Sequence, residues 1–391
     1  MNLKKYLEDN NLILPDYSNL NIVELMKFLY SKYGVDINCN NENRFSNLIN
    51  LKKHTAFILI DGMGSNLINL LSDDSVLKQH KVEDMITVCP SSTGCVLTSV
   101  ATATYPSEHG IIGWYNYNRE YNVDYYPLLF TDRDGNDLNK KGINVNDIFK
   151  IDSKLNKLNV KTKVLYPEYI YDSVYSNYAA SSSIRNSYSD LDDAFKKLKS
   201  IVYEDESTFT YLYIPYIDDL EHDYGYDSKI VMDKLIEIDN LLNDVINIKD
   251  TTIIITADHG QTNVDINKDI IMDFNEYDKY FYAKPGIDFG MSTYYVKKDK
   301  INEFETKFYN DYKNKMYLFQ TDEFLKNKVF GPNKYNDYLK SNLGEYISLC
   351  ESDSQFINSD DIESYYKKTK GNHSGLSKDE MIIPLIVIEC N

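Results

Sequence analysis

Three aspartates and three histidines follow apolar runs or lie in glycine-rich turns, positions at which a chain can place metal ligands. They are Asp61, Asp218, His222, Asp258, His259 and His373. The chain has only six histidines, and half of them belong to this set. Zinc favours this mixture of imidazole and carboxylate ligands. Six ligands are too many for one tetrahedral ion and suit two.

A second segment offers a nucleophile. Residues 89–102 read Cys-Pro-Ser-Ser-Thr-Gly-Cys-Val-Leu-Thr-Ser-Val-Ala-Thr, which predicts a turn at Pro90 followed by a helix of small residues. Free backbone N–H groups at such a helix start attract an anion. Ser92 or Thr93 could attack a substrate there if a base or a metal held the hydroxyl as an alkoxide. From this segment alone, a helix cap is the simpler interpretation of both residues.

Apolar runs that alternate with amphipathic runs position these residues. The predicted strands are 55–60, 85–89, 162–166, 208–214, 251–256, 292–296 and 382–388, and the predicted helices are 22–31, 65–71, 94–104, 190–203, 228–248, 300–312 and 337–343. This alternation predicts an α/β fold with a mostly parallel central sheet flanked by helices. Ligands of such sheets gather at the carboxyl ends of the strands, where Asp61, Asp218 and Asp258 stand.

Two regions interrupt the alternation. Residues 1–50 are expected to form a helical N-terminal extension, and residues 263–370, which are charged and rich in tyrosine, a cap or insertion over the sheet edge. The catalytic core is then made of residues 51–262 and 371–391.

Composition limits the partners. The net charge of −18 argues against a nucleic-acid polymer as ligand, since such binding relies on lysine and arginine. It leaves room for a small phosphorylated substrate, because bound divalent ions reverse the local field. No apolar run is long enough to span a membrane or to act as a signal peptide, and the five scattered cysteines suit reduced thiols. We therefore expect a cytoplasmic protein without a membrane partner; the sequence carries no signal for its oligomeric state.

The motifs, taken in order, resemble those of the alkaline phosphatase superfamily, and most closely its type I phosphodiesterase/nucleotide pyrophosphatase family. They run from Asp61 to Leu376 and cover most of the chain. They are Asp-Gly-Met-Gly at 61–64, Pro-Ser-Ser-Thr at 90–93, Tyr-Pro-Ser-Glu-His-Gly-Ile at 105–111, Asp-x-x-x-His at 218–222, Ala-Asp-His-Gly at 257–260 and Gly-Asn-His-Ser-Gly-Leu at 371–376.

The resemblance implies an alkaline-phosphatase-like core with two zinc ions and a covalent phospho-threonine at Thr93. One ion would be held by Asp61, Asp258 and His259 together with the Thr93 oxygen. The other would be held by Asp218, His222 and His373. Two ions about 4 Å apart can clamp the attacking and leaving oxygens of an in-line displacement. A nucleotide-like substrate is implied as well.

Two departures from the family pattern bear on the substrate. Well-known nucleotide pyrophosphatases carry an asparagine after the nucleophile that bonds a phosphoryl oxygen, and none follows Thr93 closely. Backbone N–H groups near Thr93 and Gly94, the zinc ions, or a group that the sequence does not identify would then replace it. The phosphomonoesterase branch uses an arginine clamp, and no arginine lies between Arg44 and Arg119, which favours diesters over monoesters.

The preferred interpretation is thus a two-zinc phosphodiesterase or nucleotide pyrophosphatase. A phosphonate hydrolase or a phosphomonoesterase with the same metal site is the first alternative. A catalytically weak metal-binding recognition module is the second, and a manganese-dependent mutase a third, since the ligands also accept manganese.

The other three histidines receive structural interpretations. His109 is expected to pack near the site, and His54 and His80 are expected at the surface.

Overall fold

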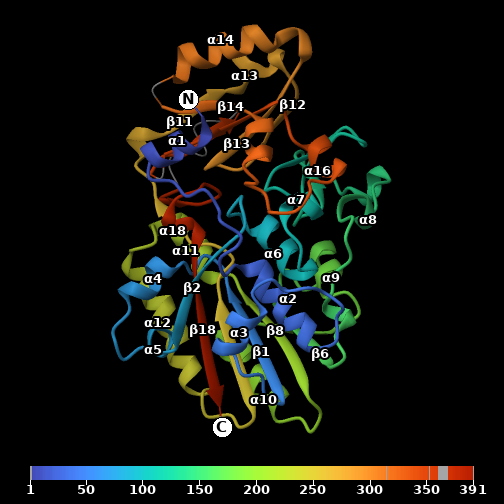
Figure 1. Ribbon diagram of the computed structural model, residues 1–391, viewed down its shortest axis with the longest axis vertical. Coiled ribbons are helices and arrows are strands. Elements are labelled where there is room, and N and C mark those ends of the chain that lie inside the picture. The colour runs from blue at the N-terminus through green and yellow to red at the C-terminus, as the bar shows by residue number, and fades with distance from the viewer. Residues whose placement is uncertain (1, 314, 352, 360–368, 391) are drawn as a thin grey trace.

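The main sheet of the computed structural model has seven strands in the order β2-β18-β9-β1-β8-β6-β7 (Figure 1). The structure describes residues 2–313, 315–351, 353–359 and 369–390. The bounds of these strands are β1 His54–Ile60, β2 Lys81–Ile86, β6 Lys161–Pro167, β7 Ile184–Tyr188, β8 Thr208–Ile214, β9 Thr251–Thr256 and β18 Ile382–Cys390.

The centre of this sheet is parallel and buried on both faces. Strand β1 pairs in parallel with β8 on one side and with β9 on the other, and every residue of the three strands is buried. Such continuous apolar runs are typical of strands covered by helices on both faces. Only β18 runs antiparallel to its neighbours. The predicted mostly parallel α/β sheet is confirmed.

Two sets of helices cover the sheet. In one set α10 contacts β8 and α12, and α12 also contacts α5 and α11; in the other α6 contacts α2, α7 and α9. In Figure 1, α2 and α3 lie in front of the strands. The bounds of the helices around the main sheet are α2 Ile22–Lys32, α3 Glu42–Leu48, α4 Ser65–Leu70, α5 Val76–Gln79, α6 Thr93–Thr102, α7 Pro106–His109, α8 Val145–Ile148, α9 Val174–Ala180, α10 Leu191–Val202, α11 Tyr216–Tyr224, α12 Lys229–Asn243 and α18 Lys378–Met381.

A second, four-stranded antiparallel sheet lies beyond the carboxyl ends of the main strands (Figure 1). It has the order β12-β13-β15-β14 and packs against α14 through a cluster of aromatic side chains. Its elements and their neighbours are α1 Leu3–Asp9, β11 Ile270–Asp273, α13 Phe274–Tyr277, β12 Phe281–Ile287, β13 Met291–Val296, α14 Ile301–Tyr312, β14 Tyr317–Gln320, α15 Thr321–Lys326, α16 Asp337–Asn342, β15 Tyr346–Leu349 and β16 Phe356–Ser359.

The first 50 residues contact both sheets. Leu3 and Leu7 of α1 belong to the apolar cluster of the second sheet, and the Tyr6 hydroxyl donates to the Leu349 carbonyl at 3.1 Å. Helix α2, in contrast, is packed in the core of the main sheet. The division into extension, core and cap stays a proposal.

Some predicted elements were wrong in place or kind. The strand predicted at 85–89 lies at Lys81–Ile86 as β2, whose sheet-edge position tolerates the exposed charges of Glu83 and Asp84. Strand β7 was not predicted, because its sequence Ile-Arg-Asn-Ser-Tyr is polar, as an edge position allows. The predicted strand 292–296 belongs to the second sheet, as β13.

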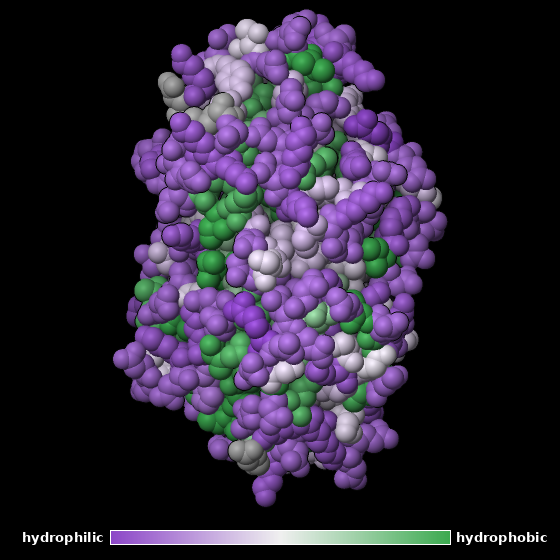
Figure 2. All heavy atoms as spheres, in the orientation of Figure 1, coloured by the Kyte–Doolittle hydropathy of each residue, from purple (hydrophilic) through white to green (hydrophobic). Residues whose placement is uncertain are grey.

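Hydrophilic residues cover most of the face seen in Figure 2. The five cysteines are all buried and free of disulfides, as expected for reduced thiols. Among the described helices, none has the length and apolar character needed to cross a membrane.

Candidate active site

Three adjacent strands bring the three aspartates together. Asp61 directly follows β1, Asp258 follows β9 by two residues, and Asp218 lies in the first turn of α11 after β8. Because β1 lies between the other two, with Ile60 paired to Ile214 and Leu59 to Thr256, the carboxyl ends of the strands meet at one edge. His259 follows Asp258, and His222 lies one helical turn after Asp218.

A short ladder brings His373 to this edge from the end of the chain. Strand β10, Thr262–Asn263, follows His259 closely and pairs antiparallel with β17, Gly371–Asn372. The imidazole of His373 then stacks on that of His259, with ring centroids 3.9 Å apart. The His222 and His373 ring centroids lie 5.1 Å apart. The structure thus brings together all six residues that the sequence analysis selected as metal ligands.

Backbone carbonyls orient the three imidazoles alike. Nδ1 of His222 lies 2.9 Å from the Gly371 carbonyl, Nδ1 of His373 lies 2.8 Å from the Ser91 carbonyl, and Nδ1 of His259 lies 3.2 Å from its neighbour's carbonyl. A carbonyl only accepts, so each Nδ1 carries the proton. Each Nε2 then carries the lone pair, which is the arrangement typical of metal-binding histidines.

One group of ligands is closed off from solvent and electrostatically strained. Asp61, Asp258 and His259 are at most 2% exposed. Burial, followed by the charges of Asp258 and Asp218, raises the pKa of Asp61 well above its ordinary value. Burial likewise raises the pKa of Asp258 to about 6 and lowers that of His259 to about 4. The two carboxylates repel each other here without a cation between them.

The other group is more open and compensates its own charge. The side chains of Asp218 and His222 are 14% and 31% exposed, and Nε2 of His222 lies 3.5 Å from the Asp218 carboxylate. Burial alone would raise the pKa of Asp218, but the imidazoles of His222 and His373 outweigh burial and hold it below its ordinary value. Burial lowers the pKa of His373 to about 4, so its ring is neutral and able to bind a metal.

These residues fit metal ions. The ligand atoms of Asp61, Asp258 and His259 lie within 4.8 Å of one another, and so do those of Asp218, His259 and His373. One oxygen of Asp61 and one of Asp258 are buried and have no hydrogen-bond partner. Buried polar atoms are normally paired, so two orphaned carboxylate oxygens beside an imidazole nitrogen indicate a site for cations.

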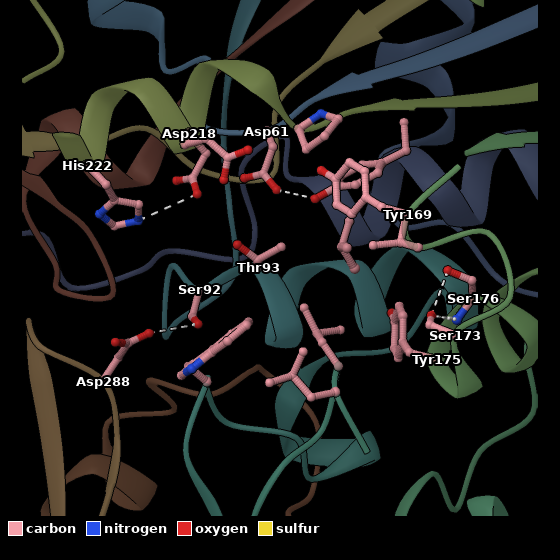
Figure 3. A pocket seen from close by; sticks show the side chains of 18 of the residues that line it. Asp61, Ser92, Thr93, Tyr169, Ser173, Tyr175, Ser176, Asp218, His222 and Asp288 are labelled. Atoms are coloured by element: carbon pink, nitrogen blue, oxygen red, sulfur yellow. Dashed lines mark hydrogen bonds and ion pairs between the residues drawn. The ribbon is translucent and has the colours of Figure 1, made fainter. Parts of the chain in front are cut away.

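Thr93 faces this cluster from the start of α6. Its hydroxyl lies 3.2 Å from Nε2 of His259, and Figure 3 shows it opposite Asp61 and Asp218. The helix-cap interpretation is wrong for this segment, because Ser92 occupies the N-cap position without a side-chain cap bond and donates instead to Asp288. The first N–H groups of α6, including that of Gly94, have no partner within the helix.

A cavity of about 800 Å³ opens in front of Thr93. Leucine and aromatic side chains form much of its wall and make it large enough for a nucleotide-sized ligand. The lining residues without a place in the ligand set include Leu97, Trp114, Tyr115, Leu128, Leu129, Tyr169, Tyr175 and Phe289.

Sequence reasoning missed several polar groups that hold the ligands. The Tyr213 hydroxyl donates to Asp61, and the Gln261 amide donates to Asp218 at 2.5 Å. Tyr213 lies near the end of β8 and pairs with Leu59 of β1, two residues before Asp61. Its place at the strand end was its one signal in the sequence. Gln261 lies two residues beyond His259.

Glu221 is the least expected of these residues. It lies in the acidic helix α11 and yet is fully buried, and neither carboxylate oxygen has a partner. Burial raises its pKa well above the ordinary value. Gly62 has a φ of +79°, and a Cβ at that position would lie 2.6 Å from the Glu221 carboxylate, so both backbone and space require glycine there.

The remaining candidates lie outside the cluster. Asn116 does not replace the family's asparagine, because its amide donates to the Gly113 carbonyl and accepts from the Ile112 N–H. His109 is buried and bonded to Ser99, as a packing residue. His54, expected at the surface, is 2% exposed because it begins the buried strand β1.

Comparisons with known proteins identify the family and the fold. The family model for type I phosphodiesterase / nucleotide pyrophosphatase matches residues 55–315, two thirds of the chain. No curated protein sequence matches the chain.

Solved structures share the fold at low identity. Murine ectonucleotide pyrophosphatase/phosphodiesterase 5 is 14% identical with a TM-score of 0.64, over 85% of this chain and 87% of that one. The human protein is 15% identical with a TM-score of 0.62, over 86% and 88%. Phosphonoacetate hydrolase from Sinorhizobium meliloti 1021 is 14% identical with a TM-score of 0.60, over 87% and 91%. The chain belongs to the type I phosphodiesterase/nucleotide pyrophosphatase family, within the alkaline phosphatase superfamily, and is a hydrolase of phosphoric ester bonds.

Proposed function

We propose that this protein hydrolyses phosphodiester or phosphoanhydride bonds through a covalent phospho-threonine at Thr93, at a site for two zinc ions. The observation that carries the proposal is the Thr93 hydroxyl, 3.2 Å from His259 Nε2 and beside two buried carboxylate oxygens that have no partner. A nucleophile at that position lies beside the candidate ligands of a cation. A weak hydroxyl nucleophile requires a base or a metal ion beside it for activation.

The ligands divide between two ions in this proposal. Asp61, Asp258 and His259 would hold one ion together with the Thr93 oxygen, and Asp218, His222 and His373 would hold the other. Ions bound there would supply Lewis-acid stabilisation of negative charge on the Thr93 oxygen and on the leaving oxygen. Manganese is the alternative metal, because the same ligands accept it.

The chain's own groups then act in a fixed order. The Thr93 oxygen attacks phosphorus while the bond to the leaving oxygen breaks on the side of His222 and His373. The N–H groups of Thr93 and Gly94, at the positive end of α6, donate to a phosphoryl oxygen. Water then cleaves the phospho-threonine ester, which releases the phosphoryl product and returns the hydroxyl to Thr93.

A small, nucleotide-like substrate suits the aromatic wall of the cavity. An inactive form of the murine relative was solved in complex with AMP. A phosphonate hydrolase is the second candidate, on the likeness to the fold of phosphonoacetate hydrolase. A phosphomonoesterase and a catalytically weak recognition module are further alternatives, and a cytoplasmic location stays a prediction.

Thr93→Ala tests the nucleophile, with Ser92→Ala as the matched control for a neighbouring hydroxyl. On zinc-loaded protein with bis(4-nitrophenyl) phosphate, we expect Thr93→Ala to lose roughly a thousandfold or more in kcat, and Ser92→Ala far less. Acid quenching during turnover should trap a phosphoryl adduct in wild type that Thr93→Ala lacks, by intact-protein mass spectrometry.

Parallel assays with 4-nitrophenyl phosphate and phosphonoacetate separate the alternatives. Faster turnover of either would replace the diesterase proposal with the corresponding activity. A Thr93→Ala protein as active as wild type would contradict the covalent mechanism, and no turnover of any of the three would favour the recognition module.

A further inference from the structure

The cavity holds carboxylates beyond those assigned to metal ions. Asp172, Asp219 and Asp288 line it together with Asp61 and Asp218. Among the described residues that line it, none is a lysine or an arginine. A second anionic group on a substrate would therefore meet carboxylates rather than a cationic partner in this part of the cavity.

Asp288 is the best placed of the three carboxylates. It is 8% exposed, accepts from the Ser92 hydroxyl at 3.2 Å and from the Phe289 N–H at 3.0 Å, and is fixed by both. Burial raises the pKa of Asp288, and the His373 imidazole opposes that rise. Figure 3 shows Asp288 and His222 on one side of Thr93, and Tyr169 and Tyr175 on the other.

Metal binding would leave the charge of Asp288 uncompensated. Two divalent ions would be balanced by the carboxylates of Asp61, Asp218 and Asp258 and by the Thr93 alkoxide. The adjacent Asp288 then adds a negative charge where few waters screen it, and buried charges act strongly on one another. A phosphate or pyrophosphate leaving group would be repelled at this point, whereas a cation would be attracted.

Aromatic rings beside Asp288 add to this preference. Phe289 follows it directly, and its ring meets that of Tyr115 edge to face with centroids 6.5 Å apart. Aromatic faces attract ammonium groups. Arg133, the cation stacked on Tyr115 at 4.4 Å, donates to the Pro285 carbonyl and does not line the cavity.

We infer that Asp288 determines the leaving group: the enzyme releases alcohols that are cationic or neutral and discriminates against phosphate and pyrophosphate. This inference rests on the proposed function, since it places the leaving oxygen on the side of His222 and His373. It narrows that function to phosphodiesters. In these substrates the phosphate carries a single negative charge, and the leaving group is either an alcohol with an ammonium group or a neutral alcohol.

Three substrates that release the same product test the inference. Thymidine 5′-phosphate would be esterified with choline, with 3,3-dimethylbutanol, which is the neutral isostere of choline, or with pyrophosphate as thymidine triphosphate. Thymidine monophosphate released by the zinc-loaded protein is measured by chromatography. The variants are Asp288→Asn and, as control for net charge, Asp192→Asn, an exposed residue of α10 outside the cavity.

We expect Asp288→Asn to reduce the choline-to-isostere ratio of kcat/KM by about tenfold and to raise the triphosphate-to-isostere ratio by a similar factor. Asp192→Asn should leave both ratios as in wild type. The change in each ratio from wild type to variant cancels the intrinsic reactivity of the leaving groups. Unchanged ratios in Asp288→Asn would overturn the inference while diester turnover upheld the proposed function.

A binding measurement covers the case in which no substrate is turned over. Calorimetry on zinc-loaded Thr93→Ala compares phosphocholine with 3,3-dimethylbutyl phosphate, which differ only in the charged atom. Tighter binding of phosphocholine, lost when Asp288→Asn is added, would support the selectivity of the cavity even if the proposed reaction failed. Equal binding of the two ligands would overturn the inference in either case.

Discussion

The two groups of candidate ligands differ in how they handle charge. Asp61 and Asp258 share a closed pocket in which burial raises the pKa of both, and each leaves a carboxylate oxygen without a partner. Asp218, in the open group, is paired with His222 and bonded by Gln261. The closed group is therefore incomplete without a cation, whereas the open group is stable by itself and accessible from the cavity. In the proposed mechanism, nucleophile activation belongs to the closed group, and exchange of leaving group and water belongs to the open group.

Removing one carboxylate from each group should have the largest effect on activity and should distinguish the two groups by stability. Asp258→Asn and Asp218→Asn should each reduce diesterase kcat by roughly a thousandfold or more, since each removes a ligand. After chelation, however, Asp258→Asn should raise Tm because it ends a buried repulsion, and Asp218→Asn should not. Differential scanning fluorimetry of the metal-free proteins measures this. Equal Tm shifts of the two variants would remove the distinction.

Histidine substitutions should give the next largest effect. His222 lies at the exposed edge of the open group, so His222→Ala should weaken the binding of one ion. We expect activity to fall by about 10- to 100-fold and to recover in excess zinc. His259→Ala should not recover, because its Nε2 lies among the closed ligands and beside Thr93. Activity measured across a zinc titration separates the two. Recovery of both variants, or of neither, would contradict the assignment.

Chelation should remove the ions in sequence. The open group is reached from the cavity, whereas the closed group is at most 2% exposed. Zinc release followed with a chromogenic chelator should thus show two phases of equal amplitude, the faster of which accelerates in His222→Ala. A single phase would indicate that the two groups are equally accessible.

His109 offers the smallest effect and a control for burial. It is as buried as His259 but lies outside both groups, and burial lowers its pKa to about 3. The unfolded chain takes up a proton near pH 6.5 and the folded protein does not, so the free energy of unfolding should fall as pH drops from 6.5 towards 3. Between pH 6.5 and pH 5 the loss from this residue is about 2 kcal/mol.

His109→Asn should flatten that part of the stability curve, measured by urea unfolding at several pH values, and leave the zinc content unchanged. A curve identical to that of wild type would show that another group titrates there.

The sequence indicated the three aspartates for a simple reason. Asp61, Asp218 and Asp258 lie shortly after apolar runs, and neighbouring parallel strands bring such positions together. His373 could be identified only through its motif, because its position in the site depends on the two-residue pairing of β10 and β17.

What the sequence could not predict depends on contacts between distant segments. Asp288 accepts a hydrogen bond from Ser92, which lies 196 residues away in the chain, and no periodicity in the sequence predicts that pair. Burial of Glu221 and His54 was missed because a charged or polar residue in a run is usually solvated, and here tertiary packing decides otherwise.

Metal content tests the central claim most directly. Mass spectrometry of the purified protein should find two zinc ions per chain, and hydrolysis of bis(4-nitrophenyl) phosphate should disappear on chelation and return with zinc. Thr93→Ala should keep both ions while losing turnover. One ion or none per chain, with no diesterase activity after zinc is added, would contradict the two-metal account.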